Sequence, residues 1–137
     1  MRYVVSLVNA WGVDFADVAA LAVVYIEEAH ATDEWPISSA RLAAAPVAIA
    51  AHKTIDDRLA AATSFARDYA VPLDRVALVA DGMGNAFQSA YASWPIRWFV
   101  FEARSAGDVV VVRIGEPDEA SFDMWEVAEE LRARRGE

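Results

Sequence analysis

The stretch Leu-Ala-Val-Val-Tyr-Ile-Glu-Glu-Ala-His-Ala-Thr-Asp-Glu-Trp occupies residues 21–35. Its first part, residues 21–26, is apolar or aromatic throughout, and charged residues follow directly. A run of this length without a polar face is typical of a strand that is covered on both faces in a parallel sheet, so we predict a buried central strand. The charged residues that run on to Pro36 predict a loop at the carboxyl end of this strand. Ligands usually bind at that edge of open α/β sheets.

Apolar periodicity in the rest of the chain predicts helices and strands in alternation. Thr54 followed by aspartates at 56 and 57 is a typical helix start. The predicted elements are helices over 3–16, 55–69, 86–93 and 118–134, strands over 21–26 and 75–80, and hairpin strands over 97–103 and 108–114. Residues 37–53 are left unassigned, except for a short extended piece over 46–49. The order predicts a single α/β domain over residues 1–137, with a thioredoxin-like mixed sheet flanked by helices and its first strand missing.

Two of these helices carry an apolar face that we expect to be buried. In the helix over 55–69 this face consists of Ile55, Leu59, Ala62, Phe65 and Ala66. In the closing helix it consists of Phe122, Trp125, Val127, Ala128 and Leu131. Gly12 weakens the interior of the first helix, because glycine is a poor helix former.

The composition excludes several classes of protein. The chain has 137 residues, is 56% hydrophobic and 24% charged, and can therefore bury a core. Its net charge of −9 argues against nucleic acid and anionic lipid as partners. It contains no cysteine, so it has no disulfide, no thiolate metal ligand and no cysteine nucleophile. The longest apolar run, 18–26, is shorter than the roughly 20 residues that span a bilayer, and we expect a cytoplasmic protein without a membrane span.

The loop after the first strand holds acid–base groups. Glu28 and His30 lie close together in the sequence, and a histidine beside a carboxylate is suited to proton transfer near neutral pH. The alternative is a solvated acidic loop with a surface histidine. His52 precedes the predicted N-cap Thr54, where a helix N-terminus favours the neutral imidazole; its alternative is a capping or packing role. Two histidines without an i, i+4 pair or a thiolate give no support for a metal site.

Two further motifs bear on ligand binding. Gly82-Met83-Gly84 lacks the remaining residues of a Walker loop or a dinucleotide fingerprint, which argues against phosphate binding. Trp94-Pro95 stands just before a predicted strand, where a thioredoxin-like fold keeps a cis-proline beside its active site. A plain turn is the alternative.

Four stretches, in order along the chain, resemble the iodothyronine deiodinase family. Residues 23–35 resemble its signature V-Y-I-E-E-A-H-x-[ST]-D-x-W. The other three are Ala-His-Lys-Thr-Ile-Asp-Asp-Arg at 51–58, Val-Ala-Asp-Gly-Met-Gly-Asn at 79–85, and Ala-Tyr-Ala-Ser-Trp-Pro-Ile-Arg at 90–97. Together they cover nearly the whole chain, and the resemblance implies a thioredoxin-like fold.

The resemblance also implies an activity and a site. In that family a selenocysteine or cysteine at the start of the first helix takes iodine from an iodinated phenol such as thyroxine, and a thiol reductant regenerates it without another cofactor. By this resemblance His30 is the proton donor or polarises the iodine, Glu28 is its partner, and His52 is a second proton relay or a contact to the phenol. The residues that would bind or shape the site around the substrate are Tyr25, Asp33, Trp35 and Arg113.

The chain departs from the family pattern at its start and in its middle. The nucleophile would lie just upstream of Met1, and one hypothesis is a gene start placed downstream of a selenocysteine codon. This chain alone then lacks the covalent step. The Ala-rich segment 37–51 is longer than in the family. The alternative functions are a non-catalytic thioredoxin-like binding or dimerisation module, or a peroxiredoxin-like redox protein. The missing strand would expose a sheet edge, which predicts a homodimer or poor solubility.

Overall fold

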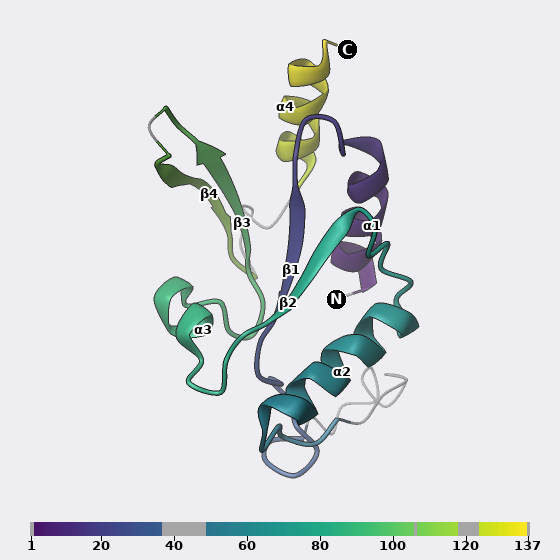
Figure 1. Cartoon of the computed structure of the whole chain (residues 1–137), viewed down its shortest axis with the longest axis vertical. Helices are drawn as coiled ribbons and strands as arrows, with labels where there is room; N and C mark the ends of the chain where they lie inside the picture. Colours follow the sequence, from purple (N-terminus) through teal and green to yellow (C-terminus); the bar gives the residue numbers. More distant parts are fainter. Residues whose placement is uncertain (1, 37–48, 106, 118–123, 137) are drawn as a thin grey trace. The chain divides into compact units, whose positions relative to one another are not determined.

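The computed structural model describes residues 2–36, 49–105, 107–117 and 124–136 (Figure 1). The chain divides into two compact units, Met1–Ala92 and Ser93–Glu137. The single domain over residues 1–137 therefore stays a prediction. The extended piece expected over 46–49 falls largely on residues 37–48, which lie outside the described residues.

The first unit alternates helices and strands, as the sequence predicts. Its elements are α1 (Arg2–Asp14), β1 (Leu21–Tyr25), α2 (Ile55–Asp68), β2 (Val76–Ala80) and α3 (Ala86–Tyr91). β1 and β2 pair in parallel, with a register that runs from Leu21 opposite Val76 to Tyr25 opposite Ala80. These bounds agree with the predicted ones to within two residues at each end, which confirms the local patterns.

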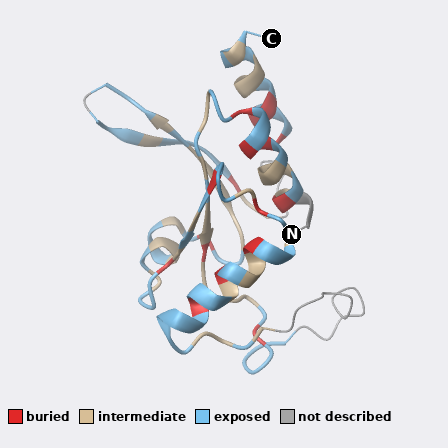
Figure 2. Ribbon diagram, turned by 45° about the vertical axis from the view of Figure 1, so that its right-hand side comes forward, coloured by how far each residue is buried: buried red, intermediate tan, exposed pale blue. Residues whose placement is uncertain are grey.

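The core of this unit lies where α1 and α2 pack against one face of the parallel pair. Val5 of α1, Ala66 of α2 and Val76 of β2 belong to one buried cluster. A methyl group at Gly12 would lie 2.5 Å from Cγ2 of Val76, so the glycine that weakens α1 also permits its close approach to β2. Buried residues of α2, red in Figure 2, lie along one side of the helix.

Two expectations about burial are wrong. β1 and β2 are not covered on both faces within the described residues, because Ala22, Ala77 and Val79 are exposed. The reason is that both helices contribute to the same cluster and so cover the same face of the pair. On α2, Ile55 and Leu59 are exposed, whereas Ala62 and Ala66 of the predicted apolar face are buried.

The second unit contains the predicted hairpin. β3 (Trp98–Ala103) pairs antiparallel with β4 (Val109–Gly115), with a register shift between Val100 and Phe101. Gly115 lies opposite Trp98, and a methyl group there would meet the indole at 2.0 Å. The position therefore excludes a side chain. The Trp94-Pro95 peptide bond is cis, as the thioredoxin-like interpretation predicts.

The closing helix α4 is described over Trp125–Arg135. The predicted start over 118–123 lies outside the described residues, and so does Phe122. Val127 and Ala128 are buried as expected, but Trp125 is 64% exposed and was wrongly placed on the inner face. The guanidinium of Arg132 lies 5.4 Å from the centre of the exposed Trp125 ring, a distance typical of a cation–π contact.

The fold class predicted from the sequence is confirmed. The structure is α/β, with small sheets flanked by helices, as in thioredoxin-like proteins. The parallel pair and the antiparallel pair are two separate two-stranded sheets within the described residues.

Candidate active site

Tyr25 is the last residue of β1 and lies on the face of the sheet that α2 covers. Its side chain is buried, and its hydroxyl donates a hydrogen bond to the carboxylate of Glu28. Its ring lies 5.7 Å from that of Phe65 and 5.8 Å from that of His52. Burial, together with the bond to Glu28, raises the pKa of Tyr25 well above its usual value. Tyr25 is therefore a neutral phenol at neutral pH.

His52 stands two residues before the N-cap of α2. The helix start is fixed by a capping box, in which Thr54 and Asp57 each accept a hydrogen bond from the other's backbone N–H. Nδ1 and Nε2 of His52 are both buried, and neither has a hydrogen-bond partner among the described residues. Burial lowers the pKa of His52, and the nearby charge of Glu28 acts in the opposite direction. The imidazole is thus neutral at neutral pH, with one donor and one acceptor to offer a ligand or a water.

His30 and Trp35 form a separate, exposed pair in the loop after β1. Their rings lie 5.8 Å apart at an interplanar angle of 62°. Trp35 is 65% exposed. The described hydrogen bonds include none between Glu28 and His30, and Glu28 is instead engaged by Tyr25. The structure therefore brings Glu28 together with Tyr25 and His52.

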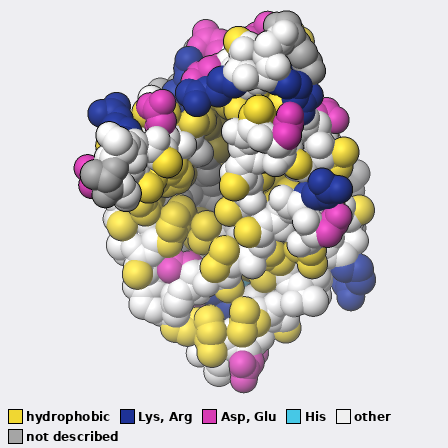
Figure 3. Space-filling model, turned by 45° about the horizontal axis from the view of Figure 1, so that its top comes forward, with side chains coloured by type: hydrophobic (Ala, Val, Ile, Leu, Met, Phe, Trp, Pro, Cys, Tyr) yellow, Lys and Arg dark blue, Asp and Glu magenta, His cyan; other side chains and the backbone are white. Residues whose placement is uncertain are grey.

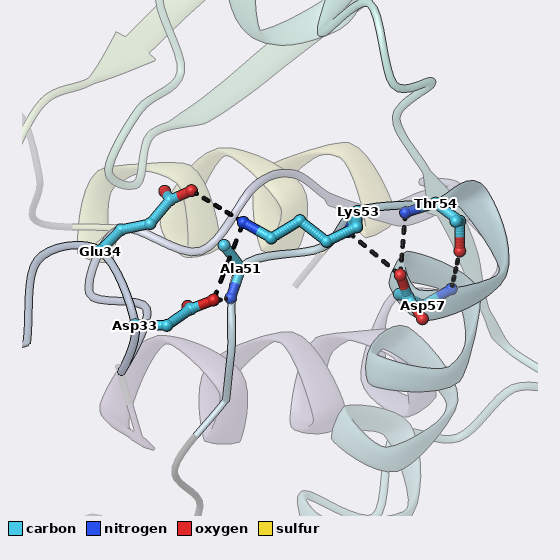
Figure 4. A network of polar contacts seen from close by, with 6 residues as sticks. All are labelled: Asp33, Glu34, Ala51, Lys53, Thr54 and Asp57. Carbon is cyan, nitrogen blue, oxygen red and sulfur yellow. Dashed lines mark hydrogen bonds and ion pairs between the residues drawn. The ribbon is translucent and has the colours of Figure 1, made fainter.

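Asp33 joins the loop after β1 to the segment before α2 (Figure 4). Its carboxylate accepts a hydrogen bond of 2.7 Å from the backbone N–H of Ala51 and lies 3.7 Å from Nζ of Lys53. Lys53 also pairs with Glu34 at 3.2 Å. The bond from Ala51 holds the pKa of Asp33 below its usual value. We call Asp33, Glu34, Ala51 and Lys53 the Asp33 network, because these residues join the loop after β1 to the residues just before α2.

The Asp33 network places His52 beside the loop after β1. His52 lies between Ala51 and Lys53 in the sequence, and both of these residues are bound to the loop after β1. The backbone N–H of Thr32 adds a hydrogen bond of 2.9 Å to the carbonyl of Ile49. The position of the imidazole near Tyr25 therefore depends on contacts across the chain as well as on the helix start.

Arg113 belongs to the second unit and is held by carboxylates of α4. Its guanidinium pairs with Glu126 at 2.9 Å and with Glu130 at 3.5 Å. Of the residues predicted to bind substrate, Arg113 is thus already engaged by acidic side chains of its own unit.

Sequence reasoning missed a buried polar group around Arg58. Arg58 and Asp81 are 2% and 6% exposed. Arg58 donates a hydrogen bond to the side chain of Asn85, and the side-chain amides of Asn85 and Gln88 both donate to Glu27. Asp81 accepts from the backbone N–H of Gln88. Arg58 ends one of the family motifs and Asn85 ends another. The position of both residues in family motifs was the only sequence feature that pointed to this buried group, because helical spacing alone does not show that a charged residue is buried.

The described residues hold neither a cluster of metal ligands nor a helix able to span a membrane. No three His, Asp or Glu side chains in the described part of the chain gather into a group that could hold a metal ion. None of the helices in the described ranges has the length and apolar character that a bilayer crossing requires.

The α/β fold, with its cis-proline before β3 and its polar site at the carboxyl end of β1, defines a thioredoxin-like protein. A family model described as Iodothyronine deiodinase matches residues 7–132. The chain therefore belongs to the iodothyronine deiodinase family.

Curated relatives carry the same family name. The chain is 38% identical over 86 residues to thyroxine 5-deiodinase of Sparus aurata, covering 63% of this chain and 29% of that protein. It is 43% identical over 72 residues to type II iodothyronine deiodinase of Petromyzon marinus, covering 53% and 23%. For thyroxine 5-deiodinase of Gallus gallus the identity is 37% over 89 residues, covering 65% and 31%. The chain thus spans less than a third of the length of these relatives.

Proposed function

We propose that the whole protein removes iodine reductively from an iodinated phenol, with an iodothyronine such as thyroxine as the substrate class. In this proposal Tyr25, Glu28 and His52 handle the phenol oxygen and its proton. The observation that supports it is the convergence of these three side chains at the carboxyl end of β1, although they come from two distant family motifs. Membership of the family and the names of the relatives supply the reaction class.

The proposed reaction needs a selenolate or thiolate nucleophile. The nucleophile attacks the iodine atom, the carbon–iodine bond breaks, and the ring carbon takes a proton. The nucleophile then carries iodine, and two thiols release it as iodide while they become a disulfide. The 137 residues contain no cysteine, so in this proposal the nucleophile comes from sequence outside this chain.

The chain's own residues would bind the phenol and move its proton. The neutral imidazole of His52, with both nitrogens buried and unpaired among the described residues, can donate to the phenol oxygen or accept its proton. The charge of Glu28 stabilises the imidazolium that would form. His30, exposed beside Trp35, would donate the proton to the ring carbon. The contact between Arg113 and a substrate carboxylate stays a prediction from the family resemblance.

Ligand binding tests the part of the site that this chain carries. We expect the 137-residue chain to bind 2,6-diiodophenol, with His52→Ala weakening binding roughly five- to tenfold, because a buried hydrogen bond contributes about 1 kcal/mol. Titration followed by NMR measures the affinity. Arg67→Ala, a change at an exposed side chain of α2 that pairs with its neighbour Asp68, is the matched control and should bind normally. Equal affinity of the His52→Ala variant and the unaltered chain would contradict the assignment.

Turnover tests the reaction itself. The DNA upstream of the Met1 codon is sequenced, and the extended protein is expressed with selenocysteine or cysteine at the nucleophile codon. Iodide release from thyroxine or 2,6-diiodophenol is then measured with a dithiol. We expect release that is abolished by His30→Ala and retained in Arg67→Ala. The absence of a nucleophile codon, or of turnover with either substrate, would refute the proposed reaction.

The thiol reductant, the homodimer and the cytoplasmic location stay predictions from the sequence. Cell fractionation tests the location, and the choice between thiol donors is tested in the iodide-release assay.

A further inference from the structure

Arg58 is a buried charge that the proposed chemistry does not use. It lies in the first turn of α2 and is 2% exposed. A buried guanidinium is costly unless polar groups surround it. Its Nη1 lies 3.0 Å and 2.8 Å from the carbonyl oxygens of Asp81 and Gly82, and 2.9 Å from Oδ1 of Asn85. Arg58 thereby fastens the start of α2 to the turn between β2 and α3.

The turn that Arg58 holds is itself bound to the loop after β1. The side-chain amide of Asn85 donates a hydrogen bond of 2.7 Å to Glu27, and the amide of Gln88 donates to the same carboxylate. The carboxylate of Asp81 accepts hydrogen bonds from the backbone N–H groups of Phe87 and Gln88, which fixes the start of α3. A continuous path of hydrogen bonds therefore runs from Arg58 through Asn85 to Glu27.

Glu27 directly precedes Glu28, the acceptor for the Tyr25 hydroxyl. Glu27 and Glu28 thus anchor the two sides of one short segment, Glu27 to the α3 turn and Glu28 to β1. Burial dominates the pKa values of both Tyr25 and His52, and the charge of Arg58 acts on both in the lowering direction. The guanidinium is therefore close enough to affect the protonation of both side chains in the candidate site.

We propose that Arg58 is a positioning residue that acts through Asn85 and Glu27 to keep Glu28 hydrogen-bonded to Tyr25. Without the guanidinium, the carbonyls of Asp81 and Gly82 and the side chain of Asn85 lose a shared donor in a buried place. Asn85 then no longer presents its amide to Glu27 in a fixed direction. The ligand-binding consequence rests on the proposed function, whereas the effect on the Tyr25–Glu28 hydrogen bond does not.

The test compares Arg58→Met and Glu27→Leu with the matched control Arg67→Met. Arg67 lies on the same helix, but its side chain is 73% exposed and pairs only with its neighbour Asp68 among the described contacts. The first measurement is the NMR signal of the Tyr25 hydroxyl proton, which the bond to Glu28 protects from exchange with water. The second is the affinity for 2,6-diiodophenol. We expect both test variants to lose the protected signal and to bind at least about fivefold more weakly, with Arg67→Met unchanged in both measurements.

A double variant separates a connected path from two independent effects. Arg58→Met combined with Glu27→Leu should weaken binding no more than the stronger single change, because both interrupt the same path. Glu27→Leu keeps the proposal testable if Arg58→Met does not fold, since Glu27 is only partly buried. Retention of the protected Tyr25 signal in folded Arg58→Met or Glu27→Leu would overturn the proposal. If the unaltered chain binds no iodophenol, the proposed function fails, and the Tyr25 signal still decides the role of Arg58.

Discussion

At the scale of single residues, His52 links the stability of the protein to pH. Its pKa is lowered by burial in the folded state, so between that value and the ordinary value of about 6.5 the unfolded chain binds more protons. The stability that the buried neutral imidazole contributes is fully present above the ordinary pKa, and it is lost as the pH falls toward the lowered pKa. We expect the free energy of unfolding to decrease from about pH 7 to pH 5, and to decrease less in His52→Gln.

Urea unfolding at several pH values measures this effect, with His30→Gln as the control because His30 is exposed. Backbone hydrogen bonds lower the pKa of Asp33, and for Asp81 such bonds outweigh the opposite effect of burial. The stability that these two carboxylates contribute is therefore lost only at lower pH, below about pH 4. If the free energy of unfolding changes with pH as steeply in His52→Gln as in the unaltered chain, a group other than His52 causes the pH dependence.

Gly12 gives a second prediction, in which the packing around this residue decides whether Gly12→Ala raises or lowers the free energy of unfolding. In an isolated helix Gly→Ala stabilises by up to about 1 kcal/mol. Here the added methyl group would lie 2.5 Å from Val76, which is 1% exposed, and overpacking of a core costs about 1–3 kcal/mol. We expect Gly12→Ala to lower the free energy of unfolding in urea. Gly82→Ala, where no atom lies within 4 Å, should change it by less than about 0.5 kcal/mol.

The family motifs name Tyr25, Glu28 and His52, which lie together at the end of β1, but the motifs do not give the contacts that these side chains make. Glu28 and His30 were expected to be partners because they are close in sequence, whereas the described hydrogen bond of Glu28 is to Tyr25. The direction of each side chain in this loop depends on distant donors, Asn85 and Gln88, that hold Glu27. A local pattern carries no information about such contacts.

At the scale of the elements, the capping box of α2 gives a direct test. Thr54 accepts a hydrogen bond of 3.2 Å from the backbone N–H of Asp57, and loss of an N-cap costs about 1 kcal/mol. We expect Thr54→Ala to lower the free energy of unfolding by this amount. Thr63→Ala is the control, since Thr63 lies exposed within the same helix and bonds only back to Leu59 among the described contacts. Thermal and urea unfolding should rank the two variants; equal effects would mean that the cap is unimportant.

The positions of the helices and strands could be predicted from the sequence, but which of their faces are buried could not. Thr54 marked the start of α2 correctly, because capping is a local interaction. The exposure of Val79 on β2 and of Leu59 on α2 depends on which faces the neighbouring elements cover. An apolar run alone does not distinguish a strand covered on one face from a strand covered on both.

At the scale of the whole molecule, exposed apolar side chains bear on self-association. Many such side chains, yellow in Figure 3, reach the surface. Val109 begins β4, whose only ladder partner among the described residues is β3. Unpaired strand edges favour association with a second copy. We expect Val109→Lys to weaken self-association roughly tenfold, because a charged residue opposes pairing at an edge.

Light scattering over a range of protein concentrations measures this association. Val13→Lys is the matched control, since Val13 and Val109 are both 62% exposed but Val13 lies in a helix. A monomer at all concentrations would contradict the homodimer. An equal effect of both substitutions would mean that general surface charge, and not the strand edge, controls association.

The Asp33 network has a consequence for how members of this family are aligned. Asp33 contacts Lys53, and Thr32 bonds to Ile49, so the described residues before position 37 and after position 48 are joined directly to each other. The entropy of closing a loop grows only slowly with its length, so we expect a change in the number of residues between the two joined stretches to have little effect on the position of the His52 imidazole. The number of residues between His30 and His52 is therefore a poor guide to equivalence, and alignments should be anchored on Asp33 and on the Thr54 cap instead.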